Sequence, residues 1–213
     1  MNMLIASAGV RAGVLFTADL TNAQENPPTT PTLTSGAPRP ASFGTASFFL
    51  NDAETALTFA ATIFNIDVTG SQTADVNDNL AAAHIHASPT VTPTTNAVVV
   101  WGFFGAPFND NSPNDFVFTP FATGVGGTFS GKRDLLEGNA TTLTAQLPNL
   151  LSDHSYINFH TTQFGGGEIR GAILAVVPEP SSLALLGVAV LALFGFANRR
   201  GPRAEGEAFV TRR

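Results

Sequence analysis

Apolar and polar residues alternate over several short stretches of this chain, and this period of two limits what the chain can fold into. Phe16, Ala18 and Leu20 are separated by single polar residues, and LTFAATI (57–63) repeats the pattern. Such alternation is typical of a half-buried β-strand, whose side chains point to opposite faces in turn. Further strands are expected at 43–51, 80–87, 96–104 and 126–132, and a hairpin is expected between 155–161 and 167–174.

Segments rich in Pro, Thr, Asn and Gly separate these strands and indicate long loops at 21–40, 67–79 and 105–124. The spacing of leucines favours one short helix near 141–151, interrupted at Pro148. About eight short strands with long loops and little helix predict an all-β fold, an antiparallel sandwich or barrel. Its core is expected to rest on phenylalanine, because the chain contains 18 Phe but one Trp and one Tyr.

The charge of the chain is low and unevenly distributed. Charged residues make up 12% of the sequence, about half of the usual share of about 25%. Residues 1–180 contain 5 Lys and Arg against 14 Asp and Glu, whereas residues 181–213 contain 5 Arg against 2 Glu. An acidic body argues against nucleic acid as a partner, because phosphate binding needs basic patches. Cysteine is absent, which excludes disulfides, thiolate metal sites and cysteine nucleophiles.

The C-terminal region combines three features in order: a Pro-Glu-Pro triplet, the apolar run 183–197, and the paired Arg199 and Arg200. The run is shorter than the roughly 20 residues of a full membrane span, but the two preceding serines bring it to the lower limit of about 17. The two arginines act as a membrane stop and would remain in the cytoplasm by the positive-inside rule. We therefore expect a C-terminal hydrophobic helix, with the body of the protein outside.

This arrangement resembles the PEP-CTERM sorting signal of Gram-negative bacteria, in which an exosortase recognises the triplet, here Pro178, Glu179 and Pro180. The resemblance implies that segment 176–200 anchors the chain in the inner membrane before processing. The body would then stay in the cell envelope or reach the cell surface or extracellular matrix. It also implies a link to exopolysaccharide and biofilm, with exopolysaccharide or other matrix proteins as partners. The alternative is an ordinary C-terminal membrane anchor, since the basic tail 201–213 is longer than usual for the signal.

The N-terminal region lacks the features of a complete export signal. Such a signal has a basic start and an apolar segment of about 7–15 residues. MNMLIASAGVRAG offers only a short apolar patch without a basic start. We expect residues 1–15 to be the remnant of an export signal or disordered.

Several fragments, taken in order, resemble the CHRD domain, a module named from chordin. They are LTNAQENPP (20–28), FGTASFFL (43–50), LTFAATIFNI (57–66), AHIHA (83–87), YINFHT (156–161) and GEIRGAI (167–173). The resemblance assigns residues 16–175 to this domain and implies an immunoglobulin-like β-sandwich or a related barrel. The family has no established enzymatic activity, so the resemblance implies a non-enzymatic envelope or matrix protein.

Two of the four histidines lie one residue apart in the segment HIH. A strand places His84 and His86 on the same face. If the fold brings His160 to them, the three imidazoles form a site suited to Zn²⁺ or Cu²⁺. The alternative is a structural network in which these histidines hydrogen-bond to loop carbonyls or carboxylates. His154 lies in an expected turn, where solvation is favoured. A metal-binding (Cu or Zn) β-sandwich is therefore the alternative to a module without a cofactor.

Glu168 and Arg170 share a face of the last strand and form a candidate structural polar pair, bonded to neighbours across a sheet edge. Other motifs are weaker. ADVNDN (74–79) and NDNSPND (109–115) resemble parts of a calcium loop but lack the Gly and Glu of an EF-hand, so solvated loops are favoured. GGTFSGK (126–132) lacks the ending of a phosphate-binding loop, because an arginine follows its lysine.

Overall fold

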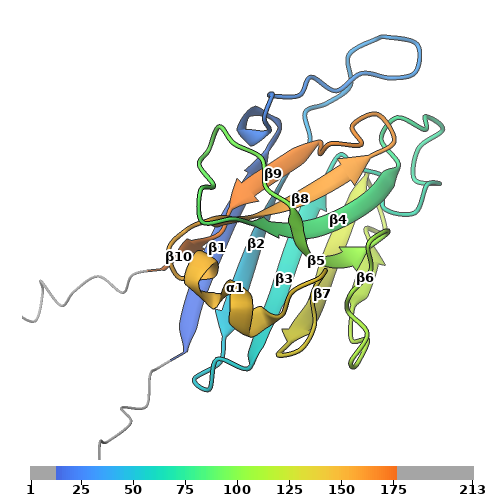
Figure 1. Ribbon diagram of the computed structural model, residues 1–213. Helices are drawn as coiled ribbons and strands as arrows, with labels where there is room; N and C mark the ends of the chain where they lie inside the picture. The colour runs from blue at the N-terminus through green and yellow to red at the C-terminus, as the bar shows by residue number, and fades with distance from the viewer. Residues whose placement is uncertain (1–12, 177–213) are drawn as a thin grey trace, which may run out of the picture. The chain divides into compact units, whose positions relative to one another are not determined.

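The computed structural model describes residues 13–176, and over this range the backbone forms one antiparallel sheet of ten strands with a single α-helix (Figure 1). The strands are β1 (Val14–Thr21), β2 (Phe43–Leu50), β3 (Ala56–Phe64), β4 (Leu80–Ala87), β5 (Val99–Phe104), β6 (Val117–Pro120), β7 (Gly126–Asp134), β8 (Ser155–Thr161), β9 (Ile169–Ala172) and β10 (Leu174–Ala175). A short 3₁₀ helix, η1, spans Asn22–Gln24, and α1 spans Leu143–Leu150.

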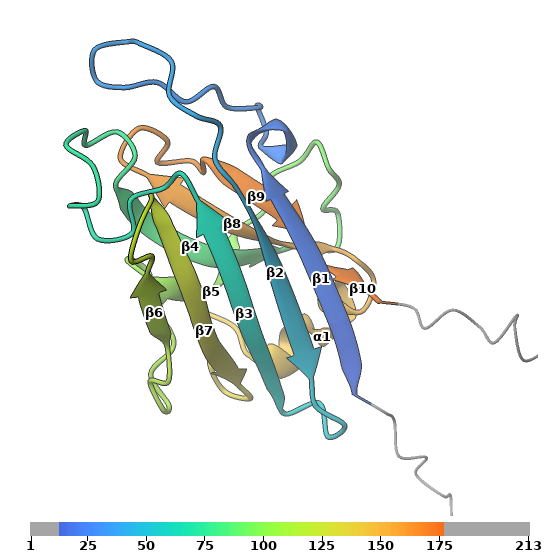
Figure 2. The ribbon, with the colours of Figure 1, turned by 180° about the vertical axis from the view of Figure 1, so that it is seen from behind.

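The sheet curls so that its two halves face each other. Its order is β5-β4-β8-β9-β1-β2-β3-β7-β6, and β10 pairs with β1. The half β5-β4-β8-β9 crosses in front of β1-β2-β3-β7 in Figure 1 and lies behind it in Figure 2. The expected all-β fold, an antiparallel sandwich or barrel, is confirmed. The predicted C-terminal hydrophobic helix lies outside the described residues, as do the sorting triplet, the two arginines and the basic tail.

The core lies between the two halves and is built on aromatic rings. Phe16, Phe48 and Phe59 stand opposite one another on β1, β2 and β3, where alternation turns them inward. The Phe59 ring meets Trp101 edge-on with centroids 5.6 Å apart, and it lies 4.6 Å from Phe103 on β5. Burying such rings supplies most of the hydrophobic stabilisation of the sheet.

Helix α1 packs on this core through Leu143, Leu147 and Leu150, which are all buried. The Thr142 side chain accepts a hydrogen bond from the Ala145 N–H and caps the first turn. The expected interruption at Pro148 is wrong, because the helix continues through it to Leu150. Proline removes one hydrogen bond from a helix, and here the buried leucine face holds the last turn in place.

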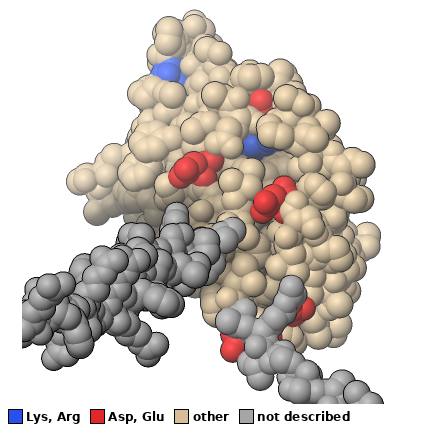
Figure 3. All heavy atoms as spheres, turned by 90° about the vertical axis from the view of Figure 1, so that its left-hand side faces the viewer, with Lys and Arg blue, Asp and Glu red and all other residues tan. Residues whose placement is uncertain are grey.

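Two further observations concern the edges of the fold. The first strand begins at Val14, two residues before the alternation that starts at Phe16. Strand β6 lies within the expected loop 105–124; its four residues are all exposed, so no apolar pattern marks it. No helix in the described range 13–176 is long and apolar enough to cross a membrane. Figure 3 shows one face of the molecule, where charged side chains are sparse and scattered.

Candidate metal centre

The outer face of β4 and β8 carries polar side chains. In the register of the two strands, His84 is opposite Asn158 and His86 is opposite Tyr156, whereas Ile85 turns into the core. A face that points away from the core would ordinarily meet water. Long loops return over this face instead, so that His84 is only 4% exposed, and His86 and His160 are each 7% exposed.

The three predicted histidines converge in the structure. One ring nitrogen from each of His84, His86 and His160 lies within 4.8 Å of one from each of the others. The closest pair is His84 Nδ1 and His160 Nε2, which are 3.1 Å apart. Two ligands of a tetrahedral metal with Zn–N bonds of about 2.0–2.1 Å are about 3.3 Å apart. The two nitrogens of this pair are therefore spaced like two ligands of one metal ion. The His86 nitrogen is farther away and would have to move slightly toward them to bind the same ion.

Each imidazole is oriented by a backbone carbonyl from a different loop. His84 Nε2 lies 3.1 Å from the oxygen of Ala106, and His86 Nδ1 lies 2.9 Å from that of Ala97. His160 Nδ1 lies 3.0 Å from the oxygen of Gly165. A carbonyl oxygen only accepts, so each of these nitrogens must carry the hydrogen. This carbonyl support is the arrangement that fixes the tautomer of metal-ligating histidines.

The remaining nitrogens consequently present lone pairs to one another. At 3.1 Å, the lone pairs of His84 and His160 repel unless a proton or a metal ion lies between them. Burial, and then the nearby His160, lower the pKa of His84 to about 4. Burial also lowers the pKa values of His86, to about 4, and of His160. A shared proton is thus disfavoured at neutral pH, and His86 Nε2 is buried without a hydrogen-bond partner among the described residues.

Arg170 braces the loop that orients His86. Its guanidinium donates to the carbonyl oxygens of Thr92, Pro93 and Thr95 and to the side chain of Asn96. The same group lies 4.3 Å from the centre of the Tyr156 ring. Tyr156 in turn stacks on His86, with ring centroids 4.8 Å apart and planes 4° apart, and its hydroxyl accepts from the Ala97 N–H. The stack fixes the plane of the His86 imidazole.

Glu168 holds a second loop, residues 22–42, against the sheet. Its carboxylate is fully buried, pairs with the Arg39 guanidinium and accepts hydrogen bonds from Ser42 and Thr161. Asn22 and Thr29 donate to its backbone carbonyl. Among the described residues, no ion pair joins Glu168 to Arg170, so the two predicted residues brace different loops.

Glu25 is a buried acid that sequence analysis missed. It lies in the loop 22–42, its Oε1 has no hydrogen-bond partner among the described residues, and Asn158 and Gly167 lie beside it. Burial raises its pKa to about 7, against the opposing effect of the Arg170 charge. A single acid in a proline-rich loop gives no sequence signal of this burial.

Replacing Glu25 by glutamine is expected to stabilise the protein increasingly as pH rises from about 5 to 8. The unfolded carboxyl ionises near its model value of 4.5, whereas the folded one holds its proton to about 7. Wild-type stability therefore falls as pH rises through this window, and glutamine cannot ionise. Urea unfolding at pH 5 and 8 measures the difference in unfolding free energy between the metal-free variant and the metal-free wild type. The histidines titrate in both proteins, so their contribution cancels. A difference that is constant or shrinks with pH contradicts the expectation.

The remaining candidate residues do not converge. In the described range, His84, His86 and His160 form the only group of three or more His, Asp or Glu side chains placed to hold a metal. In the segment 74–79, Asp75 accepts from Thr34, and Asp78 accepts from Thr73. His154 is half-buried after α1. Pro178, Glu179, Pro180, Arg199 and Arg200 lie outside the described residues.

Comparisons with known proteins identify two matches along the chain. The model of the CHRD domain matches residues 16–173, and that of the PEP-CTERM protein-sorting motif matches residues 176–200. No curated protein and no solved structure matches the chain. The first match covers most of the chain and coincides with the sheet described above, including all three histidines.

Proposed function

The chain belongs to the CHRD-domain family, and its PEP-CTERM motif marks an exported protein of the cell envelope that an exosortase processes; for its domain, we propose that it binds one transition-metal ion. The ligands are His84, His86 and His160. The observation that carries this proposal is the facing of His84 Nδ1 and His160 Nε2 at 3.1 Å, with the opposite nitrogen of each ring bonded to a carbonyl.

The ligand set favours Zn²⁺ or copper. Imidazole nitrogen suits both metals, whereas Mg²⁺ and Ca²⁺ prefer oxygen. Bound there, the ion would neutralise the repulsion between the lone pairs and join β4 to β8 beneath three loops. Its role in this proposal is to hold the loops, and the proposed function is non-enzymatic. The near-complete burial of the three rings supports this, since a reactive metal site keeps an open position for a substrate.

The destination of the protein outside the cell is part of the same proposal. We propose a matrix or cell-surface role, linked to exopolysaccharide or biofilm, with the C-terminal segment anchoring the chain in the inner membrane before processing. The low charge content supports a surface suited to uncharged partners more than to nucleic acid. Because the chain has no cysteine, disulfides cannot hold its loops in place outside the cell. A bound metal ion would hold them instead.

Titration of the metal-free full-length chain with Zn²⁺ and with Cu²⁺ tests the metal proposal. We expect one ion per chain with a dissociation constant below about 1 μM, and nitrogen hyperfine structure in the copper spectrum. Because the pKa values of His84 and His86 are about 4, binding at pH 5.5 should nearly equal binding at pH 7. Exposed histidines would instead lose the ion near pH 6.5. Absence of binding below micromolar concentration overturns the proposal and leaves the histidines as braces for the loops.

A further inference from the structure

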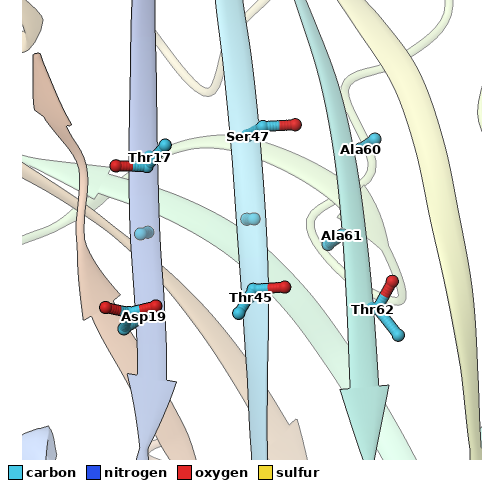
Figure 4. A pocket seen from close by; sticks show the side chains of 9 residues that line it. Thr17, Asp19, Thr45, Ser47, Ala60, Ala61 and Thr62 are labelled. Carbon is cyan, nitrogen blue, oxygen red and sulfur yellow. The ribbon is translucent and has the colours of Figure 1, made fainter. Parts of the chain in front are cut away.

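The outer face of β1, β2 and β3 is a separate surface, on the opposite side of the core from β4 and β8. Figure 2 shows no described element lying over it. A shallow hollow of about 360 Å³ lies at its centre. Thr17, Ser47 and Ala60 line it in one row, and Asp19, Thr45 and Thr62 line it in the next (Figure 4).

The rows of this face run across the strands and present hydroxyl groups at a regular spacing. Neighbouring strands are about 4.8 Å apart, and successive rows are about 6.8 Å apart. The rows continue onto β7, where Ser130 pairs with Ala60 and Thr128 pairs with Thr62. Small side chains keep the rows low, which creates the hollow. A ligand lying across the strands would therefore meet a hydroxyl group at almost every strand.

Exposed apolar side chains lie in the neighbouring rows on both sides of the hydroxyl rows. On one side, Phe43 and Phe64 are 47% and 36% exposed and stack with ring centroids 4.8 Å apart. Phe121 lies 5.1 Å from Phe64 and extends this aromatic edge. On the other side, Leu15 and Phe49 form the next row and are each 46% exposed. Exposed apolar side chains that lie together, as these rings do, can mark an interaction surface, whereas single ones are ordinary.

The face is nearly free of charge. Among the outward residues of β1, β2 and β3, Asp19 alone is ionisable. On β7, the outward Lys132 is already paired with Asp115 and Asp134, so a charged partner would find few free complementary groups on this face. A second copy of this chain, packed face to face, would bury the hydroxyl rows and two copies of Asp19 without assigned partners.

We infer that this face binds an extended, uncharged polysaccharide. Sugar hydroxyl groups would hydrogen-bond to the threonine, serine and aspartate rows, and the apolar faces of sugar rings would pack on the phenylalanines. A hexose unit in an extended polymer is comparable in length to the spacing between strands, so successive sugars along one row can meet the side chains of successive strands. The inference rests on the proposed link to exopolysaccharide and deepens it by naming the face that binds. It does not depend on the metal site, since the two lie on opposite halves of the sheet.

Affinity electrophoresis tests the inference with the full-length chain in mild detergent. Native gels contain hydroxyethyl cellulose, dextran or, as the anionic probe, alginate. We expect retardation of the wild-type chain by at least one of the two uncharged polymers. Ser47→Leu, which fills the hollow without changing charge, and Phe43→Ala, which removes an exposed ring, should each weaken binding at least about tenfold. Matched controls are Thr90→Leu, on an exposed loop, and Leu136→Ala, at a side chain that is 79% exposed.

The controls should bind like the wild type, and so should His84→Ala, which separates this face from the metal site. Circular dichroism confirms that each variant is folded. The inference is overturned if neither uncharged polymer retards the chain, if only alginate does, or if Ser47→Leu and Phe43→Ala bind normally. It is also overturned if light scattering shows a dimer that Ser47→Leu abolishes, because the face then belongs to self-association.

Discussion

Replacing Glu168 by glutamine is expected to lower the free energy of unfolding by about 3–5 kcal/mol, the usual loss when one partner of a buried ion pair is removed. The carboxylate is fully buried and faces the Arg39 guanidinium, whose side chain is 3% exposed. Glutamine keeps the shape of the side chain but leaves the arginine charge unpaired away from water. Loop 22–42 should loosen first, since Arg39 and Ser42 attach it to the sheet through this carboxylate.

Urea unfolding at pH 8 measures the effect, and Glu25→Gln is its matched control. Both variants replace a buried carboxylate by its amide, but Glu25 ionises against its surroundings whereas Glu168 has an ion-pair partner. The two changes should therefore shift stability in opposite directions. Replacing both Arg39 and Glu168 by methionine should recover much of the loss, because no charge then remains buried. A Glu168→Gln protein within about 1 kcal/mol of the wild type would contradict this account.

Replacing His160 by alanine is expected to weaken metal binding by more than about 100-fold. Residues that only support metal ligands typically contribute about 10–100-fold to affinity, and a ligand should contribute more. His160 provides the nitrogen closest to His84, so its loss leaves two ligands on one strand. Titration of each variant with Zn²⁺ against a competing chelator measures the change.

Two further variants separate ligation from loop support. Arg170→Met removes the brace on the loop that carries Ala97, so we expect a loss of about tenfold, in the range typical of supporting residues. His154→Ala is the control for a histidine outside the cluster and should bind like the wild type. Equal binding by the His160→Ala and His154→Ala proteins would show that the cluster does not ligate the ion.

The strands and the shared face of the histidines could be predicted because both depend on local periodicity. The segment HIH needs only an extended backbone to place its two imidazoles on one side. The leucine face of α1 was visible for the same reason, although Pro148 misled the prediction of where the helix would be interrupted. Strand β6 gave no signal, because it is an edge strand whose pairing with β7 places all four residues at the surface.

Contacts between distant segments could not be derived from local periodicity. Glu168 reaches Arg39 across 129 positions, and His84 reaches His160 across 76. Each of these contacts depends on how the sheet curls and on where a long loop returns. Glu25 illustrates the same difficulty, since a loop acid is exposed by default and only the packing of its loop raises its pKa to about 7.

The amino-acid sequence by itself determined the all-β class, most of the strand positions and the shared side of His84 and His86. The tertiary structure alone decided that this outward side is buried, that three loop carbonyls orient the rings, and that their free nitrogens meet. The physical reason is the range of the interactions. The direction of a side chain along a strand repeats every two residues, whereas its burial and its hydrogen-bond partners depend on segments far away in the chain.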